Sequence, residues 1–186
     1  MKKLGLLIGL GVTVFVLVIV GIVLIVGYNG LLNKKESVDQ NISQITIRIE
    51  TKDDTLSEMQ EAITDLESYS LEVFNMVTAA RAAFATAQDS GNIDQLDEAN
   101  ALLTEAYDSF VVIIEDNNLA NAVPGYLTLI EEIHTTNSLL AQSKRDYNDA
   151  VYLYNTSIKR FPAVLYAKAF GFTAEYNYWG SLEDVA

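Results

Sequence analysis

A run of 23 residues without a charged side chain, Leu4–Val26, limits the folds open to this chain more than any other feature. A helix of that length rises roughly 35 Å, and the hydrocarbon core of a bilayer is about 30 Å thick. The run exceeds the ~7–15 apolar residues of a signal peptide, and no small-x-small cleavage site follows it. The sequence therefore predicts an uncleaved transmembrane helix at residues 4–26, a single-pass protein of a cell membrane, and the lipid bilayer as a partner.

The side of the membrane on which the rest of the chain lies stays open. Lys2 and Lys3 precede the apolar run, and Lys34 and Lys35 follow it, so the positive charges that orient a span nearly cancel. The terminal amine adds one charge before the span and favours a cytoplasmic amino terminus, with the later residues outside. A formyl group on that amine would remove this preference.

A seam of residues spaced alternately by four and three follows the apolar run, from Val38 to Ala80. This spacing is typical of a helix packed along its length, as in a coiled coil. No proline occurs between residues 28 and 90. We therefore expect one long helix from about residue 28 to about Gln88, ended by residues 89–92.

Two further segments, residues 93–116 and 126–161, repeat the same spacing. Three segments with one period predict an all-α fold, an antiparallel helical bundle over residues 28–162, with the apolar and aromatic tail 163–186 as a short cap. The first segment is much longer than the second. Either it extends as a stalk, giving three helices, or it folds back near Lys52–Leu56, giving four and returning the tail toward the bilayer.

Five polar residues occupy positions in these seams. A charged or amide side chain inside a core is costly unless it is paired. Either the amines of the two lysines reach the edge of the bundle, or all five side chains form a polar layer that sets the register of the helices, and the two can coexist. The five are Lys52, Ser70, Asn100, Asn137 and Lys144.

The aromatic tail and a short repeat before it are the remaining candidates for a site. Phe170, Phe172 and Trp179 either cap the open end of the bundle or contact lipid or a partner. The pairs Tyr147-Asn148 and Tyr154-Asn155 lie seven residues apart, so both asparagines share one helix face. We expect them to hydrogen-bond a neighbouring helix.

The composition argues against several functions. The net charge is −13, and residues 82–143 contain no Lys or Arg, so a nucleic-acid partner is not expected. Cysteine is absent, and His134, which we place on the surface, is the only histidine. The spacing Glu131-x-x-His134 is half of a di-iron site that one molecule cannot complete. With no phosphate loop or nucleophile motif, we expect no enzyme, no catalytic or metal residues and no cofactor.

Four short motifs follow one another near the carboxyl end. They are Arg-Asp-Tyr-Asn-Asp-Ala-Val at 145–151, Tyr-Asn-Thr at 154–156, Arg-Phe-Pro at 160–162 and Gly-Phe at 171–172. In this order and spacing they resemble the LemA family, as does Tyr28-Asn29 after the apolar run. The resemblance covers nearly the whole chain and implies a helical bundle behind one amino-terminal span, commonly described as cytoplasmic, with no defined activity. The chain departs from the family pattern at Ser57-Glu58, where proline and asparagine are usual, and this departure favours the longer first helix.

These observations predict a non-enzymatic interaction or scaffold protein that organises other membrane proteins, or copies of itself, at a membrane. The alternative is a sensory or signalling module, in which the long first helix transmits a change and the polar seam positions form the adjustable layer.

Overall fold

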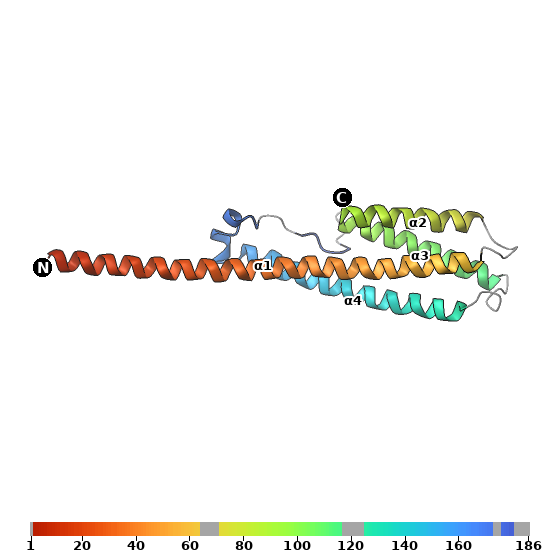
Figure 1. Cartoon of the computed structure of the whole chain (residues 1–186), viewed down its shortest axis with the longest axis horizontal. Helices are drawn as coiled ribbons and strands as arrows, with labels where there is room; N and C mark the ends of the chain where they lie inside the picture. The colour runs from red at the N-terminus through yellow and green to blue at the C-terminus, as the bar shows by residue number, and fades with distance from the viewer. Residues whose placement is uncertain (1, 64–70, 117–124, 173–175, 181–186) are drawn as a thin grey trace. The chain divides into compact units, whose positions relative to one another are not determined.

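The computed structural model describes residues 2–63, 71–116, 125–172 and 176–180, and Ser70 of the predicted polar seam lies outside them. The described residues form helices and no strands, so the all-α prediction is confirmed (Figure 1). The elements are α1 (Lys2–Ile63), α2 (Leu71–Ser90), α3 (Ile93–Asp116), α4 (Tyr126–Lys159) and the short 3-10 turns η1 (Ala163–Leu165) and η2 (Lys168–Phe170).

The predicted single helix reaching Gln88 is wrong, because the chain folds back after α1. Arg81 Nε of α2 lies 3.1 Å from Asp53 Oδ1 of α1, whereas 28 residues of straight helix would separate them by about 42 Å. The fold-back does not occur near Lys52–Leu56 either, since α1 continues to Ile63. The prediction rested on the absence of proline. A helix without proline can still end where folding back lets both halves of its apolar seam be buried.

The chain divides into two compact units. The first unit comprises residues 1–39 and 150–176, and the second comprises residues 40–149 and 177–186. The predicted bundle, residues 28–162, is thus shared between them. Charge divides in the same way: the first unit holds seven Lys and Arg against three Asp and Glu, and the second holds five against 22.

In the second unit the carboxyl part of α1, the helices α2 and α3, and the amino part of α4 bury their apolar seams. Many of the seam positions predicted from the spacing lie in this core. Among its fully or almost fully buried members are Ile45, Ile49, Leu56, Met59, Val77, Leu96, Leu103, Phe110, Ile114 and Ile133.

The turn between α2 and α3 lies where the sequence predicted a helix stop. Gly91 has φ +61°, a left-handed conformation that glycine adopts at little cost, and its N–H donates to the carbonyl oxygen of Ala87. Asn92 Oδ1 then accepts the backbone N–H groups of Asp94 and Gln95 at 2.8 and 3.3 Å. Asn92 is therefore the cap of α3.

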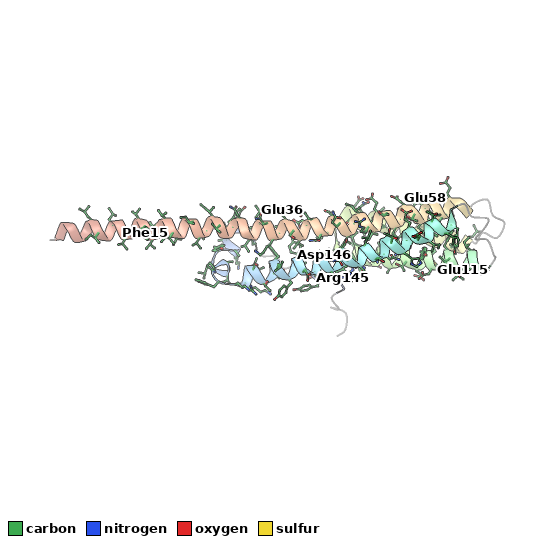
Figure 2. All side chains as sticks on the ribbon, turned by 90° about the horizontal axis from the view of Figure 1, so that it is seen from below. Phe15, Glu36, Glu58, Glu115, Arg145 and Asp146 are labelled. Carbon is green, nitrogen blue, oxygen red and sulfur yellow. The ribbon has the colours of Figure 1, made fainter. Side chains whose placement is uncertain are left out.

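In the first unit the amino part of α1 packs against the end of α4. Leu31 and Val38 of α1 are buried, as are Tyr154 and Ile158 of α4. The apolar residues of α1 before this contact are exposed, and the Phe15 side chain stands out from the helix (Figure 2). An 18-residue window there has a mean hydropathy of 3.1, so in the described part of the chain α1 alone is long and apolar enough to cross a membrane.

Candidate functional site

The first unit contains an aromatic cluster at the point where the apolar stretch of α1 ends. The Tyr28 ring meets those of Phe170 and Phe172 edge to face, each at 5.5 Å between centroids. Tyr166 packs its hydroxyl directly on Gly27, where the Cβ of any other residue would overlap it. These contacts hold the segment that contains η1 and η2, residues 160–172, against α1; we call it the tail segment.

The outer surface of the tail segment is apolar with a basic rim. Phe161 is 80% exposed, Leu165 73% and Val164 51%, whereas Phe172 is buried. Phe170 lies between these extremes, at 44% exposed. A shallow groove of about 440 Å³ is lined by Ile158, Lys159, Val164, Ala167, Lys168 and Phe172.

Asn155 fixes the chain that follows the tail segment. Its Nδ2 donates to the Tyr176 carbonyl oxygen at 2.9 Å, and its Oδ1 accepts the Tyr176 N–H at 3.1 Å. The Tyr176 ring lies 5.2 Å from that of Tyr154, and its hydroxyl donates to Asp39 at 3.1 Å. The same carboxylate pairs with Lys35. Burial raises the pKa of Tyr176, and the adjacent Asp39 carboxylate adds to the shift.

Asn148 makes the equivalent pair of bonds in the second unit, with Trp179. Its Oδ1 accepts the Trp179 N–H at 2.7 Å, and its Nδ2 donates to the Trp179 carbonyl oxygen at 3.3 Å. The indole Nε1 donates to Asp97 at 2.8 Å, and the Lys144 ammonium lies 4.6 Å above the ring. Trp179 is only 9% exposed, so most of its side chain is covered by these contacts.

The asparagine repeat therefore binds the tail, and the expectation that its partner is a helix is wrong. The spacing explains the choice of partner. Seven residues of α4 rise about 10 Å, and three residues of extended chain, from Tyr176 to Trp179, also span about 10 Å. An extended tail can thus meet Asn155 and Asn148 in succession.

The second unit buries part of the predicted polar seam. Lys52 is 1% exposed, and its Nζ donates to Thr104 Oγ1 at 2.5 Å and to Asn100 Oδ1 at 3.4 Å. Burial, with a smaller contribution from the nearby Lys144 charge, lowers the pKa of Lys52 to about 8, and Asp108 opposes the shift. A lysine that loses its charge more easily than usual thus lies inside the bundle.

Two other described members of the predicted polar seam, Lys144 and Asn137, lie away from these hydrogen bonds. Lys144 is partly exposed and pairs with Asp97 at 3.2 Å. Asn137 is half-buried, next to the buried Thr136. Sequence reasoning missed Thr104, although it lies one turn after Asn100 on the same helix face.

His134 lies on the surface of the second unit, 6.4 Å from the Tyr107 ring. Across the residues that the structure describes, no three His, Cys, Asp or Glu side chains are grouped as metal ligands would be.

The chain has an apolar amino-terminal helix of span length, then antiparallel helices and a tail bound along the last of them. These features define a helical-bundle protein with one candidate membrane span among its described residues. The sequence profile of the LemA family matches residues 41–184, and the chain belongs to this family. No protein with a curated description matches the chain.

Proposed function

We propose that this protein is a single-pass membrane protein whose helical bundle serves as an interaction scaffold at the membrane surface. The observation that carries the proposal is the continuity of α1, which runs unbroken from its exposed apolar stretch into the packed seam of the bundle. The anchor and the seam are thus parts of one helix and are not joined by a flexible linker.

The polar groups of the described clusters support a scaffold role more than a catalytic one. Asn148 and Asn155 each use both ends of their amide to hold the tail. The Lys52 amine is enclosed among side chains of the bundle. Polar groups engaged in this way are not free to bind and convert a substrate.

The charge of the second unit indicates the kind of partner. Its 22 acidic residues outnumber its five basic ones, and Glu58 and Glu115 stand out from its surface (Figure 2). Such a surface steers basic protein segments toward it and repels nucleic acid. We therefore propose other membrane proteins with basic segments next to their spans as partners, with copies of the chain as the competing partner.

Photocrosslinking in intact cells tests this proposal. A photoreactive residue at Glu58 or Glu115 should form adducts with proteins that have basic juxtamembrane segments, and high salt during crosslinking should weaken these adducts. A matched probe at Tyr152, an exposed position of the first unit, should capture fewer of them. Exclusive adducts with the chain itself would support self-assembly instead, and the absence of adducts at both acidic positions would contradict the scaffold proposal.

The buried Lys52 layer favours a second candidate, a signalling module. A polar layer inside a bundle can switch between two hydrogen-bonding arrangements, and α1 would carry the difference along its length. Replacing Lys52 by leucine should leave the crosslinked partners unchanged if the protein is a scaffold. If it is a signalling module, the same substitution should fix one crosslinking pattern under all growth conditions.

A further inference from the structure

The tail segment lies beside α1 at the level where a membrane span would leave the hydrocarbon core. Its contacts are made to Gly27 and Tyr28, the first residues after the apolar run, and Figure 1 shows the two 3-10 turns in blue beside α1. Two residues of helix rise about 3 Å, and the headgroup layer on each side of a bilayer is several ångströms thick. The tail segment therefore lies at the boundary between acyl chains and headgroups if α1 crosses the membrane.

The exposed side chains of the tail segment suit that boundary. Phe161, Val164, Leu165 and Phe170 are 44–80% exposed on a segment of ten residues. Exposing several neighbouring apolar side chains to water costs free energy. Such a patch therefore indicates a surface that contacts another molecule or a membrane. The tail segment contacts Gly27 and Tyr28, directly after the apolar stretch of α1. Because that stretch would lie in the bilayer, lipid is the molecule that we expect to cover this surface.

The basic residues of the first unit carry the charge that would attract anionic lipid headgroups. Lys159, Arg160 and Lys168 are exposed on or next to the tail segment, in a unit where positive charges outnumber negative ones, while the second unit is strongly acidic. Lys159 and Lys168 also line the groove whose base is formed by the buried Ile158, Ala167 and Phe172. A cationic rim around an apolar base is the pattern that anionic phospholipid requires.

We infer that residues 159–170 form a second membrane contact. Phe161, Val164, Leu165 and Phe170 enter the interface of the bilayer, and Lys159, Arg160 and Lys168 bind anionic headgroups. The first unit is then attached to the membrane at two points, the α1 span and the tail segment. This inference rests on the proposed membrane span.

Quenching by nitroxide-labelled lipids tests the inference on the full chain in vesicles. The chain has no cysteine, so Leu165→Cys accepts a single environment-sensitive fluorophore. Tyr152→Cys is the matched control, because Tyr152 is 52% exposed. It lies two residues from Tyr154, whose ring packs on Tyr176, and the Tyr176 hydroxyl donates to Asp39. Asp39 is about 20 Å along α1 from Val26. The fluorophore at Leu165 should be quenched by the labelled lipid, and that at Tyr152 should not.

A third position separates the inference from the proposed function. A fluorophore at Phe15→Cys reports on the span itself. Quenching at Phe15 without quenching at Leu165 overturns the second contact and keeps the anchor, whereas loss of quenching at both positions overturns the anchor as well. Equal quenching at Leu165 and Tyr152 also overturns the inference.

The lipid composition tests the basic rim. Adding phosphatidylglycerol to phosphatidylcholine vesicles should increase quenching at Leu165, because each basic side chain near an anionic surface shifts the equilibrium between bound and free segment about fivefold. The variant K159Q/R160Q/K168Q should lose this increase and keep the quenching at Phe15. An increase that persists unchanged in that variant would contradict the assigned role of the three residues.

Discussion

Lys52 makes the stability of the second unit depend on pH, in the direction opposite to that of a lysine whose pKa is raised by a carboxylate partner. The amine is enclosed by neutral hydrogen-bond partners, and its pKa falls from 10.5 to about 8. Between these two values the unfolded chain keeps the Lys52 proton that the folded chain has lost. The free energy of unfolding therefore rises as the pH increases through this range.

The size of the rise follows from the two pKa values. Between about pH 7 and about pH 9.5 the difference in proton binding integrates to about 2 kcal/mol. Tyr107 and Tyr126 act in the opposite direction at higher pH, because burial raises their pKa above 10 and the unfolded chain then ionises first. The measurement therefore stops below about pH 10, where their ionisation begins.

Urea unfolding of the full chain in detergent micelles, followed by helical circular dichroism, measures this rise. Lys52→Met should make the free energy of unfolding flat across the same pH range, because methionine keeps the volume and removes the titrating group. Lys159→Met, at an exposed position, should keep the full rise. A wild-type protein with no rise, or a Lys52→Met variant with an undiminished one, would refute the reasoning.

Three further substitutions and one control substitution test particular contacts. Arg81→Gln removes the guanidinium that faces the half-buried carboxylate on α1 and should lower the free energy of unfolding by about 2 kcal/mol; an unchanged urea midpoint would speak against the fold-back. Asn148→Ala should release the tail and shift the emission of Trp179, the single tryptophan, to longer wavelength, and an unshifted spectrum would contradict the pairing. Gly27→Ala should push the tail segment from α1 and reduce lipid quenching of a fluorophore on it. Gly30→Ala, with open space around its Cβ, should leave that quenching unchanged, and equal effects of the two glycine variants would argue against the contact.

The residues of the core could be predicted, because the spacing of apolar residues indicates which face of each helix is buried. Val38, Ile45, Leu103 and Phe110 all lie where the alternation of four and three residues placed them. The number of helices was not predictable in the same way. A seam has the same spacing whether its helix continues or folds back, and the absence of proline near Ser57 carries no information about a turn that tertiary packing produces.

The tail was harder to predict than the helices, because an extended segment held by side chains has no periodicity. The repeat of Asn148 and Asn155 was visible, but the sequence does not show that Tyr176 and Trp179 are its partners. Likewise, Asp97 is an ordinary acidic residue in the sequence, and only the fold brings the Trp179 indole and the Lys144 amine to it.

The central claim, that the apolar stretch of α1 crosses a membrane and continues into the bundle, is tested most directly by cysteine accessibility along α1. Single cysteines from residue 8 to residue 40 in sealed vesicles should resist a membrane-impermeant maleimide through Val26. Exposed positions beyond Tyr28 should react from one side of the vesicle only. Uniform reaction along the whole of α1 would contradict the claim, because it would mean that the apolar stretch lies in water.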